Sequence, residues 1–138
     1  METQTGSTKN KVLVVDDNLL NRKLASAVLK SCNLDFKTAE NGKIAFEEYL
    51  TGEYNIILMD IQMPIMNGIE CSKQIREHEI NQKISTPIPI IAVTTFSMSS
   101  DKRNCFDAGI NDVLAKPYKT TDLLQMISKF IKIEDIDG

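Results

Sequence analysis

Short apolar runs alternate with longer segments of helical periodicity along the chain. The runs that predict strands are Lys11–Val15, Asp35–Ala39, Ile56–Met59, Pro89–Val93 and Asp112–Ala115. The first and third are almost wholly apolar, as expected of strands buried on both faces of a sheet. The second (DFKTA) alternates weakly and suits a more exposed strand. The pattern therefore predicts a sheet whose strands differ in exposure.

The segments between these runs predict helices. Their bounds are Asn18–Ser31, Asn41–Leu50, Asn67–Glu79, Ser100–Ala108 and Thr120–Ile133. In the first helix, the residues that recur at helical spacing, as on the core-facing stripe of an amphipathic helix, are Leu20, Leu24, Ala27 and Val28. In the last helix, the residues expected to face inward are Leu123, Leu124, Ile127, Phe130 and Ile131.

Five strands that alternate with five helices predict an α/β fold with a parallel sheet covered on both faces. The stretch Ile80–Ile88 contains two prolines and no clear period, which indicates a loop before the fourth strand. In folds of this class the functional site lies at the carboxyl ends of the strands. The informative residues are therefore those that directly follow each apolar run.

Composition limits the class of protein. The 138 residues suit one domain, and 42% hydrophobic with 25% charged residues is ordinary for a soluble globular protein. A net charge of −3 argues against nucleic-acid binding, and no apolar run approaches the roughly 20 residues of a membrane span. Residues 1–10 are expected to form a disordered leader and residues 134–138 a short acidic tail.

The cysteines indicate a reducing compartment, so we expect a cytoplasmic protein. Cys32, Cys71 and Cys105 are odd in number and form no Cys-x-x-Cys pair. We interpret them as small interior hydrophobes rather than metal ligands. His78, the only histidine, lies beside two glutamates and is interpreted as a solvated surface residue.

Polar residues follow four of the five predicted strands. They are Asp16 and Asp17 after the first, Asp60 after the third, Thr94 and Thr95 after the fourth, and Lys116, which precedes Pro117, after the fifth. Clustered carboxylates resist ionisation unless a cation neutralises them, and Mg²⁺ takes oxygen ligands of this kind. A metal-bound carboxylate site suits phosphoryl transfer. Asp60 is the expected nucleophile, with Lys116 and the Thr94 hydroxyl contacting phosphoryl oxygens.

Each motif has a plain structural alternative when it is taken alone. Asp16 and Asp17 could cap the first helix, Lys116 could be a solvated lysine, and Thr94 with Thr95 could simply end a strand. Their joint placement at successive strand ends favours a functional site.

The same residues resemble the receiver domains of two-component response regulators and hybrid histidine kinases. The matching stretches are KVLVVDDNLLNRKLA, YNIILMDIQMPIMNGIE, PIPIIAVTTF and GINDVLAKPYK, within residues 11–133. The resemblance implies a doubly wound, flavodoxin-like (βα)5 sheet with strand order 2-1-3-4-5.

The resemblance also implies a role for each site residue. Asp60 corresponds to the phosphoacceptor, Asp17 to a direct Mg²⁺ ligand, and Asp16 to an acidic partner that reaches the metal through water. The backbone carbonyl of Gln62 completes the metal site. Thr94 and Lys116 contact the phosphoryl group, and the Lys116–Pro117 peptide bond is expected to be cis.

The implied activity is that of a phosphorelay receiver, which catalyses only its own phosphorylation and dephosphorylation and is not a kinase. The expected donor is a histidine kinase or a histidine phosphotransfer protein. It is expected to dock near Asn18, Leu19 and Arg22, with help from the final loop at Pro117. No direct contact with nucleic acid or membrane is expected, and the chain is expected to be a monomer or a weak homodimer.

The chain departs from the family pattern at several positions. Val113 replaces a common aromatic residue, Thr95 replaces a smaller residue, and neither Gln62 nor Phe96 is acidic at positions that tune autodephosphorylation. We therefore expect an aspartyl phosphate that outlasts that of fast-cycling chemotaxis receivers.

Three other classes of protein share part of this pattern. A haloacid dehalogenase-type phosphatase requires a second aspartate where Gln62 stands. A flavodoxin-like or dinucleotide-binding module places a phosphate loop after the first strand, where this chain has Asp16 and Asp17. A degenerate receiver that acts as a phosphorylation-independent binding module stays open, although the intact set of site residues argues against it.

Overall fold

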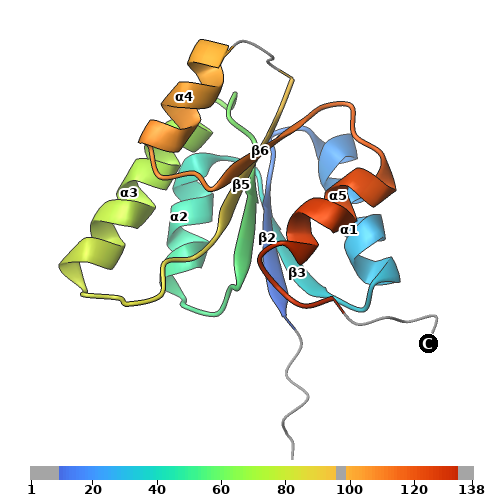
Figure 1. Cartoon of the computed structure of the whole chain (residues 1–138), viewed down its shortest axis with the longest axis horizontal. Coiled ribbons are helices and arrows are strands. Elements are labelled where there is room, and N and C mark those ends of the chain that lie inside the picture. The colour runs from blue at the N-terminus through green and yellow to red at the C-terminus, as the bar shows by residue number, and fades with distance from the viewer. Residues whose placement is uncertain (1–9, 96–98, 134–138) are drawn as a thin grey trace, which may run out of the picture.

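A five-stranded parallel sheet forms the centre of the molecule (Figure 1). The computed structural model describes residues 10–95 and 99–133. The strands are β2 (Lys11–Val15), β3 (Asp35–Ala39), β4 (Ile56–Met59), β5 (Ile90–Thr94) and β6 (Asp112–Ala115). Their order in the sheet is β3-β2-β4-β5-β6, and all four pairings are parallel. When the five strands are numbered one to five along the chain, this is the predicted order 2-1-3-4-5, which is confirmed.

The helices between these strands are α1 (Leu19–Ser31), α2 (Gly42–Leu50), α3 (Gly68–Asn81), α4 (Ser99–Asp107) and α5 (Thr120–Ser128). Three of them begin one residue after an asparagine. The side chains of Asn18, Asn41 and Asn67 each accept a hydrogen bond from a backbone N–H in the first turn. These caps satisfy N–H groups that the helix itself cannot, so the asparagines fix where the helices start.

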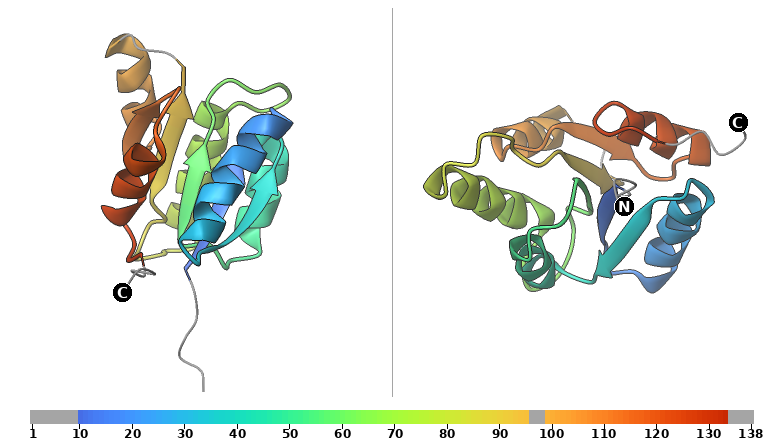
Figure 2. Two further views of the ribbon diagram at one scale, coloured as in Figure 1. Left: turned by 90° about the vertical axis from the view of Figure 1, so that its right-hand side faces the viewer. Right: turned by 90° about the horizontal axis from the view of Figure 1, so that it is seen from below.

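Helices cover both faces of the sheet (Figures 1 and 2), and an apolar core lies beneath the helices on each face. One core, beneath α2, α3 and α4, includes Leu13, Ile57, Ile75 and Cys105. The other, beneath α1 and α5, includes residues such as Val12, Leu29, Leu58 and Ile127. Successive residues of β2 and β4 alternate between these cores, which is why both strands are apolar throughout.

The last helix is shorter than predicted. It ends at Ser128 and not at Ile133, and Lys129 N–H and Phe130 N–H bond to carbonyls three residues back. Phe130 and Ile131 still pack against the core beneath α1 and α5, so they face inward as expected but from a turn. The prediction failed because burial of these side chains does not require helical backbone.

Of the apolar stripe predicted on α1, only Val28 packs against the core. Ala25 and Leu29 are buried, whereas Leu20 is 63% exposed and Leu24 is 56% exposed. Residues 25, 28, 29 and 32 form a competing stripe of the same period that packs on the sheet. The leucines of the predicted stripe are therefore available at the surface.

The burial of two cysteines agrees with the sequence interpretation, whereas the environment of His78 differs from it. Cys71 and Cys105 are buried, as interpreted, and Cys32 is partly exposed. His78 is less exposed than predicted: it is half-buried and meets the rings of Tyr49 and Phe46 edge-on, with centroids 5.5 and 6.4 Å away. Within the described residues, no helix combines the length and apolar character needed to cross a membrane.

A buried hydroxyl on α3 offers a test of the packing. Ser72 is fully buried, and its Oγ has no hydrogen-bond partner among the described residues. Because an unsatisfied buried polar group costs about 1–3 kcal/mol, Ser72→Ala is expected to raise the free energy of unfolding by about 1 kcal/mol in urea titrations. Ser26→Ala is the control, because Ser26 Oγ donates to Arg22 O at 2.7 Å. Loss of stability in Ser72→Ala alone would contradict this packing.

Candidate functional site

The sheet itself brings the acidic residues together. Val15 and Met59 are paired across β2 and β4, so the residues that follow them leave the sheet side by side. Asp60 N–H continues the ladder by donating to Val15 O at 2.9 Å, and Asp16 N–H donates to Ala39 O at 3.1 Å. The backbone of each aspartate is therefore held by the neighbouring strand.

Three carboxylates meet at this edge. Asp16, Asp17 and Asp60 each offer an oxygen, and these oxygens lie within 4.8 Å of one another. Asp16 and Asp60 are each only 6% exposed, whereas Asp17 is exposed. Closely spaced oxygen ligands of this kind fit Mg²⁺, which takes one or two carboxylates and keeps several waters. The acidic cluster can thus hold a metal ion.

Lys116 supplies the only described ion pairs to this cluster. Its Nζ lies 2.7 Å from Asp16 Oδ2 and 3.7 Å from Asp60 Oδ2. Its backbone N–H donates to Thr94 O at 2.7 Å, which fixes the lysine at the end of β6. One ammonium against three carboxylates leaves a net charge of −2 for these four groups, so the cluster favours a divalent cation.

Asp60 is the carboxyl most perturbed by this environment. Burial raises the pKa of Asp60 to about 6; Asp16 and Asp17 add to the rise, while Lys116 and the Gln62 N–H oppose it. The Gln62 N–H lies 3.3 Å from Asp60 Oδ1. Without a cation, the ionised form of Asp60 therefore destabilises the folded state. A bound cation would favour the ionised form, which is the form that can act as a nucleophile.

The Thr94 hydroxyl is free to take a partner. Thr94 is 1% exposed, and its Oγ1 has no hydrogen-bond partner within the described part of the chain. Thr95, the next residue, is exposed, and Gln62 has an exposed side chain. Val113 is half-buried in the core beneath α2, α3 and α4, whereas Phe96 lies outside the described residues.

Gly68 and Asn21, which the sequence analysis did not name, also shape the site, and Arg22, expected only to contact a partner, does so too. Gly68, at the start of α3, sits so close to Asp60 that an added Cβ would lie 2.2 Å from Asp60 O. Asn21 and Arg22 turn from α1 toward Asp16: Asn21 Nδ2 lies 3.5 Å from Asp16 Oδ1, and Arg22 Nη1 donates to Asp16 O at 2.7 Å. Only the three-dimensional approach of α1 and α3 reveals these contacts.

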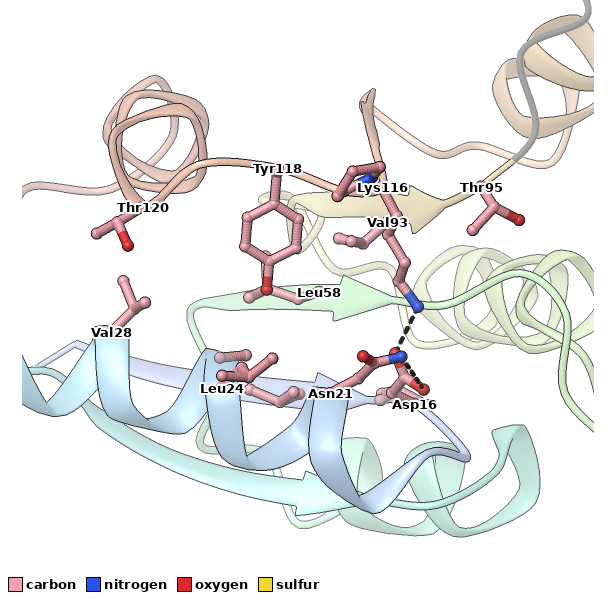
Figure 3. A pocket seen from close by; sticks show the side chains of 14 residues that line it. Asp16, Asn21, Leu24, Val28, Leu58, Val93, Thr95, Lys116, Tyr118 and Thr120 are labelled. Carbon is pink, nitrogen blue, oxygen red and sulfur yellow. Dashed lines mark hydrogen bonds and ion pairs between the residues drawn. The ribbon is translucent and has the colours of Figure 1, made fainter.

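A cavity of about 480 Å³ adjoins the site between α1 and the segment that links β6 to α5 (Figure 3). Asp16 and Lys116 lie at one end, and Leu24, Val28 and Tyr118 line the apolar remainder. Burial raises the pKa of Tyr118, with a smaller contribution from Asp16. The hollow shows that α1 and α5 do not close over the core beside the site.

The residues expected to contact a partner lie around this edge. Leu19 is 57% exposed, and Pro117 is exposed and lines the cavity. The Asn18 side chain caps α1 by accepting from the Asn21 N–H, and the Arg22 guanidinium donates to the Asp16 carbonyl. The Lys116–Pro117 peptide bond is cis, as expected. The leader and the tail fall outside the described residues, apart from Asn10.

Comparisons with known proteins agree with this geometry. The family model described as the response regulator receiver domain matches residues 12–128. The chain is 43% identical over 129 residues to hybrid signal transduction histidine kinase B of Dictyostelium discoideum, covering 88% of this chain but 7% of that kinase.

Solved receivers share the fold. The receiver domain of Saccharomyces cerevisiae Ssk1, crystallised with the histidine phosphotransfer protein Ypd1, matches with a TM-score of 0.85 and 33% identity over 88% of each chain. The receiver domain of the Pseudomonas aeruginosa histidine kinase PA1611, with magnesium coordinated in its active-site cleft, matches with a TM-score of 0.79 and 31% identity, covering 89% of this chain and 98% of that one. The chain belongs to the response regulator receiver domain family.

Proposed function

We propose that this receiver accepts a phosphoryl group from a phosphohistidine onto Asp60 and passes the change to a partner or a linked domain. The observation that carries the proposal is the convergence of Asp60 with Asp16, Asp17 and Lys116 at one edge of the sheet. The chain spans only 7% of the length of the hybrid kinase named above.

The proposed metal site consists of the carboxylates of Asp16, Asp17 and Asp60 with the backbone carbonyl of Gln62. The magnesium ion in the active-site cleft of the PA1611 receiver supports this choice of cation. When bound, Mg²⁺ would neutralise phosphoryl oxygens and offset the charge that develops during transfer.

In the proposed reaction, an oxygen of the ionised Asp60 carboxylate attacks the phosphorus of the donor phosphohistidine. The new O–P bond forms as the P–N bond breaks, and the bonding pair returns to the imidazole nitrogen. Lys116, already 3.7 Å from Asp60 Oδ2, pairs with a phosphoryl oxygen, and Thr94 Oγ1 donates its unused hydrogen to another. The chain thereby catalyses its own modification through charge and position.

Output is proposed to begin at Thr94. A hydrogen bond from its buried hydroxyl to the phosphoryl group would draw the end of β5 toward Asp60, and the segment that leads to α4 follows directly. Val113 offers no aromatic ring to move with Thr94, so a smaller rearrangement is expected. The exposed, non-acidic Gln62 is consistent with a slowly hydrolysed aspartyl phosphate, which stays a prediction.

The phosphoryl donor is proposed to dock over the start of α1 and the loop that carries Pro117. Leu19 and Leu20 expose 57% and 63% of their surface there, and the crystallised Ssk1 receiver with Ypd1 supports a histidine phosphotransfer protein as the class of partner. Three cysteines without a Cys-x-x-Cys pair suit a reducing compartment, so we place the domain in the cytoplasm. We propose that it is a monomer or a weak homodimer.

Lys116 provides the first test of the proposed reaction. Lys116→Met is expected to slow phosphorylation by acetyl phosphate in Mg²⁺ about 100-fold, because a charge aimed at the phosphoryl oxygens is lost. Lys119→Met is the matched control, since Lys119 is exposed three residues away. The rate would be followed by intact mass against time. Equal rates in wild type and Lys116→Met would contradict the assigned role.

Asp60 provides a second test, through stability. Its folded-state pKa of about 6 exceeds its ordinary value of 3.8, so the folded state binds more protons than the unfolded state between these values. The free energy of unfolding therefore falls as pH rises through this window. Without divalent cation, Asp60→Asn is expected to be more stable than wild type at pH 7 by about 1–2 kcal/mol, after allowance for solvent screening.

The measurement is urea denaturation of both proteins in EDTA from pH 4 to pH 7. The stability difference is expected to vanish toward pH 4 and to shrink at pH 7 when Mg²⁺ is added, since only wild type gains the full metal site. If Asp60→Asn were less stable than wild type at pH 7 in EDTA, ionised Asp60 would not destabilise the folded state, and this prediction would be wrong.

A further inference from the structure

Ile65 has a backbone conformation that is unfavourable for its side chain. It lies in the segment between β4 and α3 with a φ of 73°, and Met66 N–H donates to Pro64 O at 2.8 Å across it. A hydrogen bond between residues two apart around a positive φ is a strained three-residue turn. For a β-branched residue this left-handed conformation is an outlier.

Other positive-φ positions are filled by more suitable residues. Of the three such non-glycine residues that the structure describes, Asn33 is of a type that tolerates this region, and Lys83 is unbranched at Cβ. Ile65 alone is β-branched. It is also 78% exposed, above every other large hydrophobic side chain in the described part of the chain. The residue is thus unfavourable both in its backbone and in its exposure to water.

The fold does not require isoleucine at this position. Met66 O accepts from Gly42 N–H at 2.9 Å, and Gly68 N–H donates to Ile61 O at 3.0 Å. These bonds shape the loop through backbone atoms, and Met66, not Ile65, packs against the core. Asparagine or glycine at position 65 would preserve the turn with less strain. An outlier that packing does not explain indicates a function.

The segment between β4 and α3 places Ile65 near Asp60, where a phosphoryl donor has to dock. Ile65 follows Asp60 by five residues, a stretch that spans at most about 18 Å, and the Gly68–Ile61 bond closes the loop further. A protein interface of about 800 Å² per partner has a radius of roughly 16 Å. The loop also leaves the sheet at the same edge as the start of α1 (Figure 2), where Leu19 and Leu20 are exposed. Ile65 therefore lies within or at the border of the area that a protein donor docked over Asp60 would cover.

We propose that Ile65 is a specificity-determining contact for the protein phosphoryl donor, inserting its side chain into an apolar surface depression beside the donor's phosphohistidine. The inference rests on the proposed function. A small phosphodonor fits at Asp60 without reaching Ile65, so the two kinds of donor separate the contact from the chemistry.

The test compares wild type with Ile65→Asn, which tolerates the left-handed turn. The melting temperature is expected to rise by about 3–6 °C as strain is relieved. Phosphorylation by acetyl phosphate is expected to stay within about twofold of wild type. The kcat/KM for transfer from histidine-phosphorylated Ypd1 is expected to fall about tenfold. This corresponds to the loss of about 1.4 kcal/mol of interaction free energy, as for an interface contact residue.

Two further variants control the result. Ile80→Asn removes an equally exposed isoleucine (76%) near the end of α3 and is expected to leave both transfer rates unchanged. Ile65→Leu keeps an apolar side chain and is expected to retain at least about half of the wild-type rate with Ypd1.

The outcomes separate the two proposals. Equal transfer from Ypd1 to wild type and Ile65→Asn overturns the role of Ile65, as does a parallel loss with both donors. Wild type that accepts from acetyl phosphate but not from Ypd1 also overturns the docking proposal while the chemistry at Asp60 stands. Wild type that accepts from neither donor overturns the proposed function itself.

Discussion

Two buried carboxylates of like charge have to be held side by side, and the rest of the structure follows from this constraint. Asp16 and Asp60 are each 6% exposed at the ends of adjacent parallel strands. Their separation is set by backbone bonds between β2, β3 and β4, which side-chain repulsion cannot relax. Lys116 forms ion pairs with both carboxylates and offsets part of that repulsion. A rigid, partly neutralised charge cluster is well prepared to bind a divalent ion and a phosphoryl group.

Several unfavourable features gather around this cluster. The Thr94 hydroxyl is buried without a partner, the pKa of Asp60 is raised to about 6 by burial first and by the neighbouring carboxylates, and Ile65 holds a left-handed turn. The two large cores on either face of the sheet tolerate these costs. Under the proposed function, Thr94 and Asp60 would contact the phosphoryl group and Ile65 the protein donor, so stability would be exchanged here for chemistry and recognition.

Much of the fold was predictable, because strands buried on both faces are apolar throughout and helices after Asn18, Asn41 and Asn67 carry their own start signals. The site was predictable for a related reason. Parallel strands deliver the residues after them to one edge, so polar residues at strand ends converge whatever the loops do.

The predictions of the buried face of α1 and of the end of α5 were wrong because the sequence is compatible with two packing arrangements at each place. Residues 20, 24, 27 and 28 and residues 25, 28, 29 and 32 both have helical period, and only packing on the sheet selects the second stripe. Phe130 and Ile131 are apolar at the expected spacing but pack from a turn after α5. The conformation of Ile65 carries no sequence signal, because isoleucine is the residue type least expected with a positive φ. The contacts of Arg22 and Gly68 with the site depend on tertiary approach alone.

The central claim is that Asp60 is the phosphoacceptor of a Mg²⁺-dependent site. Intact mass after incubation with acetyl phosphate, with and without Mg²⁺, tests it most directly in wild type and Asp60→Asn. We expect wild type to gain one phosphoryl group only when Mg²⁺ is present, and the variant to gain none. Equal labelling of both proteins would show that the acceptor is another residue. A gain by wild type that does not depend on Mg²⁺ would contradict the metal site formed by Asp16, Asp17 and Asp60.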